Sequence, residues 1–189
     1  SPHTVIDIVT DDMPFLVDSI TMVVYRHGLV IHRLLHPLLG VERAVDGALQ
    51  STRPRGAAGS RPESWTHLEI DRIGDTALVD QLQREIVDVL ADVRAAVEDG
   101  AAMQQRMREA DEEMAGDTVA DGGEAAAYLR WIAANNFVFL GYADYRAAAG
   151  DGVLVRVPDS GLGILRQTDH PRFGSCLAGI PGVVTELAR

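Results

Sequence analysis

The order of apolar and polar positions over residues 4–31 predicts a strand, a helix and a second strand. Residues 4–10 are β-branched or apolar except Asp7, a pattern typical of a strand with one covered face. Apolar residues then recur at helical spacing, which predicts a helix packed against a sheet: Phe15 or Leu16, Ile20, Val23 or Val24, and His27. Gly28 fits the left-handed position that ends a helix, and a strand restarts over residues 29–35.

A third strand and a second helix follow after a polar stretch. Residues 44–63 are rich in Gly, Ala, Ser, Pro and Arg without an apolar period, which predicts a surface loop. Residues 64–73 alternate in polarity and predict a strand, so the loop joins two strands suited to a long antiparallel hairpin. Asp75 or Thr76 then fits the N-cap of a helix whose apolar stripe runs to about Val97.

The predicted order over residues 1–100 is β-α-β-β-α. These are five of the six elements of the ferredoxin-like βαββαβ topology, and they predict an α+β domain with an antiparallel sheet and helices on one face. A sixth strand does not follow, because residues 101–115 continue as a polar, acidic helix after a break at Asp99-Gly100. Two alternatives remain open: the closing strand comes from much later, or the sheet has three local strands and borrows its edge.

The rest of the chain predicts a helical connection and a second, smaller α/β piece. Residues 101–123 form a helix followed by a linker in this interpretation. Within 124–189 the pattern predicts a helix to about residue 135 and a β-hairpin made of strands over 137–147 and 152–158. The chain opens on a strand and ends in mid-pattern, so we expect a fragment of a longer protein.

Composition narrows the classes of function. The net charge is −11, with 17 basic residues that are all Arg, which argues against nucleic acid or an anionic membrane as a partner. No apolar run approaches the roughly 20 residues of a membrane span, and the N-terminal SPHTVID lacks the features of a signal peptide. The single cysteine, Cys176, excludes an internal disulfide and suits a reducing compartment, so we expect a cytoplasmic protein.

The acidic turn before the first helix is the candidate ligand site. Free N–H groups at a helix N-terminus can bind the carboxylate of an amino acid, and either acidic side chain can then meet its α-ammonium group. The alternative is that the two aspartates only cap the helix and nothing binds. The candidate ligand-binding residues are Asp11, Asp12, Met13, Pro14, Phe15 and Leu16.

Other groups of residues carry weaker signals. Four histidines invite a metal interpretation: His27, His32, His36 and His67. The alternative gives the first of them a role at a helix end and the others a role at a subunit contact, and neither an HxxxH helix nor a CxxC pair is present. Gly161-Leu162-Gly163 lacks the third glycine of a dinucleotide loop and predicts a turn. We therefore predict no metal ligand, catalytic residue or cofactor-binding residue in this chain.

Two resemblances rest on these residues. Asp12-x-Pro14-x-Leu16, followed by Ile20, Gly28 and Ile31, resembles the opening of an ACT domain, a module that senses amino acids in many metabolic enzymes. Four longer phrases, in this order, resemble the N-terminal region of the large NAD-specific glutamate dehydrogenases of bacteria: DIVTDDMPFLVDSI, RHGLVIHRLLHPLL, YLRWIAANNFVFLGYADYR and VPDSGLGILR. The chain departs from the ACT pattern at Phe15, where the family usually has glycine.

The resemblance implies a regulatory or assembly segment. In that family, hydride transfer between glutamate and NAD lies in a C-terminal region absent from this chain, so the fragment alone is expected to be inactive and without a cofactor. The expected partners are a free amino acid effector, other domains of the parent enzyme, and a second copy through the ACT-like sheet.

Two further interpretations stay open. One is a purely architectural module that spaces the subunits of a large oligomer without binding a ligand. The other is a metal-dependent enzyme built on the histidines with Asp11 and Asp12. A sensor requires a saturable effect of an amino acid, an architectural module requires only self-association, and a metalloenzyme requires bound metal.

Overall fold

The computed structural model describes residues 2–116, 122–147 and 154–167. The chain divides into two compact units, Ser1–Val93 and Arg94–Arg189. The fold is α+β, and the antiparallel sheet of unit 1 confirms the ferredoxin-like class predicted from the sequence.

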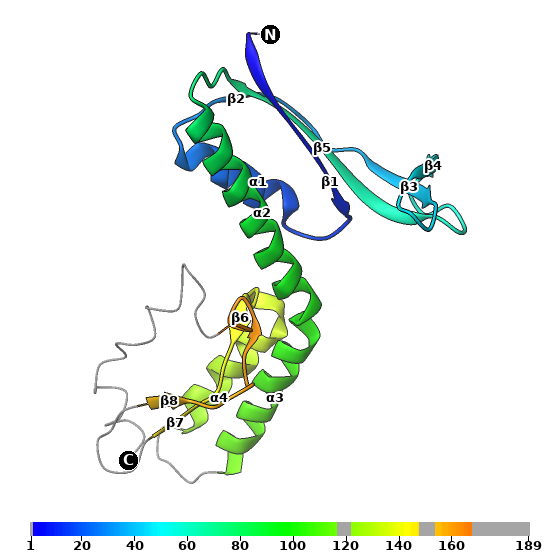
Figure 1. The fold of residues 1–189 in the computed structure, drawn as a ribbon. Helices are drawn as coiled ribbons and strands as arrows, with labels where there is room; N and C mark the ends of the chain where they lie inside the picture. The colour runs from blue at the N-terminus through cyan, green and yellow to red at the C-terminus, as the bar shows by residue number, and fades with distance from the viewer. Residues whose placement is uncertain (1, 117–121, 148–153, 168–189) are drawn as a thin grey trace. The chain divides into compact units, whose positions relative to one another are not determined.

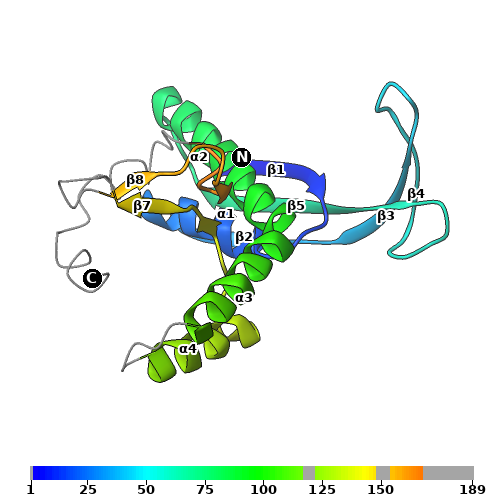
Figure 2. The same cartoon turned by 90° about the horizontal axis from the view of Figure 1, so that it is seen from below.

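Unit 1 is an antiparallel sheet with two helices against one face (Figure 1). Its elements are β1 His3–Asp11, α1 Leu16–Arg26, β2 Ile31–Leu35, β3 Leu38–Arg43, β4 Leu49–Pro54, β5 Arg61–Asp71 and α2 Thr76–Glu98. The central strand, β5, pairs with β1 along its whole length on one side and with β2 and then β3 on the other. The β3–β4 hairpin extends the sheet away from the helices (Figures 1 and 2).

β1 is an edge strand, since β5 is its one strand partner among the described residues. The two strands that flank α1, β1 and β2, do not pair with each other, since each pairs with β5. The position for a sixth element of the ferredoxin-like topology is next to β1, on the side away from β5. Both alternatives for that element, a later segment of the chain or a borrowed edge, stay open.

The core of unit 1 lies between the sheet and the two helices. Alternate residues of β5 face the helices, as predicted, and both helices turn their apolar stripes toward the sheet. The buried residues on these surfaces are Ser64, Thr66, Leu68 and Ile70 of β5, Leu16, Ile20, Val23 and Val24 of α1, and Leu82, Ile86, Val89 and Val93 of α2. Each fully buried aliphatic side chain stabilises the fold by about 1.5–3 kcal/mol relative to exposure.

Two helix ends are formed by the residues predicted for them from the sequence. Gly28 has φ +68°, the left-handed conformation expected just past the end of α1, and its N–H bonds the carbonyl of Tyr25. The Asp75 carboxylate accepts a hydrogen bond from the N–H of Ala77 at 2.9 Å and so caps α2.

The predicted surface loop over residues 44–63 is wrong. This stretch contains β4 and the start of β5, which continue the sheet beyond the reach of the helices. Its side chains are polar because it has no helix to pack against. Instead, Arg43 donates two hydrogen bonds to Glu63, at 2.6 and 2.8 Å, and the Trp65 indole donates a third at 3.0 Å. Arg43 holds the pKa of Glu63 below its usual value.

One carboxylate ties α1 to α2. Glu85 of α2 accepts hydrogen bonds from Gln81 at 2.9 Å and from Arg26 at 2.7 Å, and its carboxylate lies 3.1 Å from a ring nitrogen of His27. These bonds, led by that from Gln81, lower the pKa of Glu85 to about 2. Arg26 and His27, at the C-terminal end of α1, are thereby held against Glu85 of α2.

Unit 2 is mostly helical in its first part. Its elements are α3 Gly100–Gly116, α4 Gly122–Trp131, the π-helical turn η1 Ile132–Asn136, β6 Gly141–Tyr142, β7 Tyr145–Ala147, β8 Leu154–Arg156 and β9 Leu162–Gly163. The predicted hairpin is confirmed as β7 paired with β8, although both strands are shorter than the sequence suggested. The break at Asp99 between the two long helices is also as predicted.

The turn predicted at Gly161-Leu162-Gly163 is wrong: Leu162 and Gly163 form β9, which pairs with β6, and the turn follows at residues 164–165. Gly163 has φ +60°, and a Cβ there would lie 2.2 Å from the carbonyl oxygen of Leu140, so only glycine fits. Asp99 accepts a hydrogen bond from the N–H of Gly163 at 2.6 Å and two from Arg166 at 2.6 and 2.8 Å. The turn is thus fixed to the helix junction of the same unit.

Substitution of Leu68 tests the placement of the core. Leu68 is fully buried, so Leu68→Ala should lower the free energy of unfolding by about 2–5 kcal/mol. Leu35→Ala is the matched control, because Leu35 is 53% exposed and should cost about 1 kcal/mol or less. Urea unfolding followed by Trp65 fluorescence, in a Trp131→Phe background, reports on unit 1 alone. Equal losses in the two variants would contradict the assigned faces.

Glu85 should make unit 1 sensitive to acid. Its pKa is lowered from 4.5 to about 2 in the folded state, so the ionised carboxylate stabilises the fold above pH 4.5 and this contribution is lost as the pH falls toward 2. Glu85→Gln should lose about 1 kcal/mol at neutral pH, a value discounted for partial exposure, and should flatten the acid dependence. Urea unfolding at pH 7, 4 and 3 measures this, with exposed Asp88→Asn of the same helix as control. Parallel pH profiles for Glu85→Gln and the unmodified chain would refute the assignment.

Candidate functional site

The turn of residues 11–16 lies between the end of β1 and the start of α1. Asp12 is joined to the sheet, because its N–H donates to the carbonyl of Pro62 at 3.2 Å. Its carboxylate pairs with Arg55 at 2.7 Å, and its side chain is only 13% exposed. Asp11 pairs with Arg61 at 3.0 Å and is more exposed. The turn is therefore held by two ion pairs, one to Arg55 just after β4 and one to Arg61, the first residue of β5.

The structure corrects the predicted role of the two aspartates as helix caps. The N-cap of α1 is Phe15, and no capping hydrogen bond from a side chain is present there among the described residues. Both acidic side chains are directed to arginines instead. Pro14 lies in the turn just before the N-cap rather than in the first helical turn.

Phe15 occupies an unusual backbone conformation. Its φ is +68° and its ψ is 5°, in the left-handed region that favours glycine. The ring is 45% exposed, so packing covers only about half of it. The conformation explains why glycine suits this position in ACT domains, and it shows that Phe15 is accommodated at a conformational cost.

The six predicted residues divide by burial. Leu16 is 2% exposed and anchors α1 in the core, so its side chain does not face the turn's outer surface. Met13 is half-buried, and Pro14 and Phe15 are exposed. The groups available to a ligand are thus the carboxylates of Asp11 and Asp12, their arginine partners and the backbone at the start of α1.

Sequence reasoning missed Arg55 and Arg61. Both lie in the stretch interpreted as a loop, and their pairing with the acidic turn spans more than 40 positions of sequence. The only signal available was the presence of arginines in an acidic chain, which does not specify a partner. Together, the two arginines and the two aspartates place both signs of charge beside an uncapped helix N-terminus.

The histidines lie mainly on the sheet face opposite the helices. His67 pairs with Asp7 at 2.7 Å, and this hydrogen bond raises the pKa of His67. His32 pairs with Asp71 at 2.8 Å, and the rings of His3 and His32 are 4.4 Å apart. These contacts form neighbouring pairs rather than one centre.

Two further observations on the described part of the chain concern metal binding and membrane insertion. No group of three or more His, Cys, Asp or Glu side chains there is arranged to hold a metal ion. Within residues 2–116, 122–147 and 154–167, no helix has both the length and the apolar character to cross a membrane. Cys176 lies outside the described residues.

Two substitutions at position 15 separate backbone strain from side-chain contacts. Phe15→Gly and Phe15→Ala both remove the ring, but only glycine adopts φ +68° at no steric cost. Phe15→Gly should therefore be more stable than Phe15→Ala by about 1 kcal/mol. Urea unfolding of the two variants measures the difference. If alanine were as stable as glycine, the left-handed conformation would be excluded.

Comparison with known proteins supplies the family. Residues 1–86 match the family of the glutamate dehydrogenase ACT1 domain, a match that ends within α2. A relative from Halomonas elongata, an NAD-specific glutamate dehydrogenase, is 36% identical over 183 residues, which are 92% of this chain and 11% of the relative. The NAD-specific glutamate dehydrogenase of Pseudomonas aeruginosa is 34% identical over 177 residues, 88% of this chain and 11% of the relative.

A third relative extends the range of organisms. The NAD-specific glutamate dehydrogenase of Mycobacterium tuberculosis is 29% identical over 173 residues, 85% of this chain and 10% of the relative. The matches cover both units, whereas the chain spans only about a tenth of each relative's length. The chain belongs to the NAD-specific glutamate dehydrogenase family, as an N-terminal region that contains the ACT1 domain.

Proposed function

We propose that this chain is a non-catalytic regulatory segment of an NAD-dependent glutamate dehydrogenase, and that its ACT domain senses a free amino acid at the turn of residues 11–16. The rest of the enzyme would bind NAD and carry out the oxidative deamination of glutamate to 2-oxoglutarate. The observation that supports this best is the helix N-terminus of α1, which has no side-chain cap and lies beside Asp12 and Arg55.

This arrangement suits a zwitterion. The N-terminus of α1 and the arginine guanidinium groups favour a carboxylate, while the two aspartates favour an ammonium group. A free amino acid carries both charges on neighbouring atoms. A purely anionic or purely cationic ligand would leave one sign of charge at the turn unmatched.

The same contacts suggest how binding alters the domain. Asp12 is held by Arg55, and its N–H is bonded to Pro62 at the start of β5. An effector whose ammonium group binds Asp12 competes with Arg55 and so changes the restraint on the segment between β4 and β5. The segment that joins β4 to β5 thus responds when an effector occupies residues 11–16.

We assign NAD to the part of the enzyme outside this chain. The glycine segment 161–163, which contains β9, does not fit a dinucleotide, because a Cβ at Gly161 or Gly163 would collide with the backbone of Leu165 or Leu140. These glycines make room for the protein's own backbone rather than for a pyrophosphate. The segment therefore has a packing role.

A thermal-shift screen of the 189-residue chain against the twenty amino acids tests the sensor. A ligand that binds only the folded state stabilises it by about 2.7 kcal/mol at 100 times its Kd, so one amino acid should raise the Tm in a saturable way. Asp12→Asn should abolish this shift. Asp18→Asn is the control, because it makes the same charge change in the first turn of α1, outside residues 11–16, and should retain the shift.

Three results would overturn the sensor. One is that no amino acid raises the Tm at millimolar concentration. Another is a shift that Asp12→Asn leaves unchanged, which would place the ligand elsewhere. Loss of the shift in both variants would also count against a site at Asp12, since it would indicate a general effect of charge.

A second candidate function is assembly without a small ligand. The unpaired outer edge of β1 favours it, because an exposed strand edge is a ready template for pairing with another chain. Self-association through the sheet remains a prediction of this kind. The two functions are compatible, since the acidic turn and the β1 edge use different atoms.

A further inference from the structure

The outer edge of β1 is incomplete on two counts. Among the described residues no strand pairs with it, so Val5, Asp7 and Val9 in the middle of β1 direct their N–H and C=O groups away from the sheet. Ile6 and Ile8 face the helices, yet both are only half-buried, unlike Leu68 and Ile70 of the neighbouring strand. Unpaired backbone and partly covered core residues therefore occur on the same edge.

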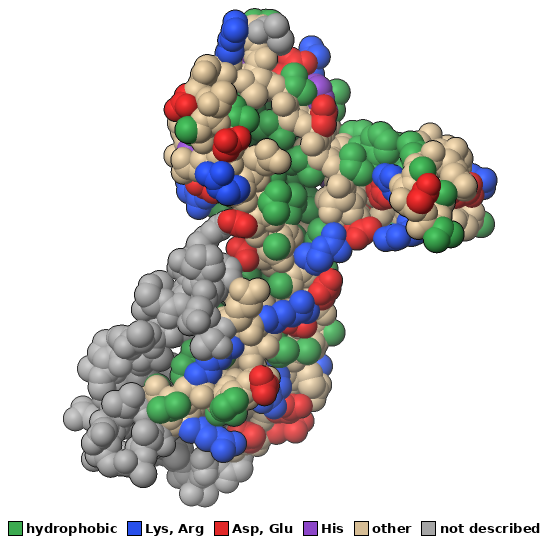
Figure 3. Space-filling view, viewed as in Figure 1, with side chains coloured by type: hydrophobic (Ala, Val, Ile, Leu, Met, Phe, Trp, Pro, Cys, Tyr) green, Lys and Arg blue, Asp and Glu red, His purple; other side chains and the backbone are tan. Residues whose placement is uncertain are grey.

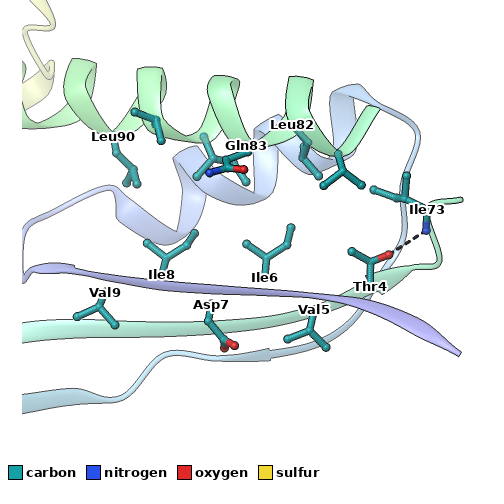
Figure 4. Close-up of a pocket in the computed structure, with 13 residues that line it drawn as sticks. Thr4, Val5, Ile6, Asp7, Ile8, Val9, Ile73, Leu82, Gln83 and Leu90 are labelled. Atoms are coloured by element: carbon teal, nitrogen blue, oxygen red, sulfur yellow. Dashed lines mark hydrogen bonds between the residues drawn. The ribbon is translucent and has the colours of Figure 1, made fainter. Parts of the chain in front are cut away.

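A groove runs along this edge. It has a volume of about 470 Å³ and lies between β1 and α2, within unit 1. Figure 4 shows Ile6 and Ile8 pointing from β1 toward α2, with Leu82 and Leu90 above them. On the α2 side, the groove is also lined by Val79 and Val87, which are 38% and 59% exposed. Hydrophobic side chains are visible at the surface between α2 and β1 in Figure 3.

The topology explains why α2 leaves this space. α1 connects β1 to the parallel strand β2 by crossing over β5. Connections between parallel strands of one sheet are right-handed, so the face that carries the helix fixes the direction in which the next strand is placed. By the same rule, a strand that follows α2 and runs parallel to β5 must lie beyond β1, with α2 above it. α2 is therefore placed over a position next to β1 that the described residues leave without a strand.

This placement disfavours a second copy of β1 as the occupant. A second copy that paired through β1 would bring its own α2 over the same two strands. The two helices, each about 10 Å wide, would then compete for the space above strands about 4.8 Å apart. The groove instead suits one extended strand that carries no helix on this face.

We propose that the β1 edge and the groove under α2 receive a single β-strand from the part of the parent glutamate dehydrogenase outside these 189 residues. The relatives provide such chain in abundance, since this sequence spans 11% of the length of two of them. The proposal rests on the family assignment and is independent of amino-acid binding at residues 11–16.

Charge and polarity define the chemistry of the donated strand. The residues that face α2 must be aliphatic, to pack on Ile6, Ile8 and Leu90. On the open face, Asp7 is 70% exposed, although it is bonded to His67, and a basic residue opposite it would complete the pair. A separate hollow on α2, which shares Gln83 and Val87 with the groove, is lined by Asp80, Arg84 and Asp88, so charged residues of both signs border the apolar groove.

Amide hydrogen exchange, compared between the complete enzyme and the 189-residue chain, tests the proposal. The amides of residues 3–11 should exchange at least about tenfold more slowly in the complete enzyme than in the 189-residue chain, because a new strand would pair their outward N–H groups. β4 is the internal control, since it is the opposite edge of the same sheet. Its residues 49–54 should exchange alike in the two proteins.

A pair of variants of the complete enzyme identifies the groove. Val87→Arg places a charged side chain in the groove from an exposed position and should return residues 3–11 to the fast exchange of the isolated chain. Met22→Arg is the matched control, because Met22 is a 52% exposed helix residue outside the groove and its replacement should retain the protection.

Three outcomes would overturn the proposal. Equal exchange of residues 3–11 in the two proteins would show that no strand is added. Protection that survives Val87→Arg would place the partner elsewhere. Protection that appears in the isolated chain and grows with its concentration would identify a second copy as the occupant.

Discussion

The pairing of β5 with strands on both sides is the constraint on which unit 1 depends. β5 is the one strand that joins β1 to β2 and β3, and its helix-facing residues, including Leu68 and Ile70, are fully buried. The helices α1 and α2 cover this face and are tied to each other by Glu85. Where β5 extends past the helices, ion pairs such as Arg43–Glu63 replace apolar packing. The candidate ligand turn and the incomplete β1 edge are both positioned by this strand.

Much of this fold could be predicted from the sequence because its signals are local. The alternation of β5, the apolar stripe of α1 and the left-handed Gly28 follow from periods of two and 3.6 residues and from the conformational freedom of glycine. The strand β4 was missed because its sequence, LQSTRP, is largely polar and the strand is held by backbone pairing with β3. Hydrophobic periodicity carries no information about such a strand.

The place of the acidic turn in the fold could be predicted, but the contacts of its side chains could not. The sequence indicates an acidic turn at a helix N-terminus, and the structure keeps Asp11 and Asp12 there. Their partners, Arg55 and Arg61, come from beyond β4, so the ion pairs depend on the register of the sheet. The left-handed Phe15 could not be foreseen either, because tertiary structure imposes that conformation on a residue that disfavours it. The turn of this ACT domain therefore carries charges of both signs, from its aspartates and their arginine partners, together with the bulky Phe15.

The central claim is that this region regulates glutamate dehydrogenase without taking part in its chemistry. The most direct measurement is the initial rate of glutamate-dependent NAD reduction by the complete enzyme, titrated with the amino acid that stabilises the isolated chain. The account predicts that Asp12→Asn removes the response to the effector and leaves the rate without effector unchanged. A loss of the basal rate itself, or an unaltered response, would contradict it.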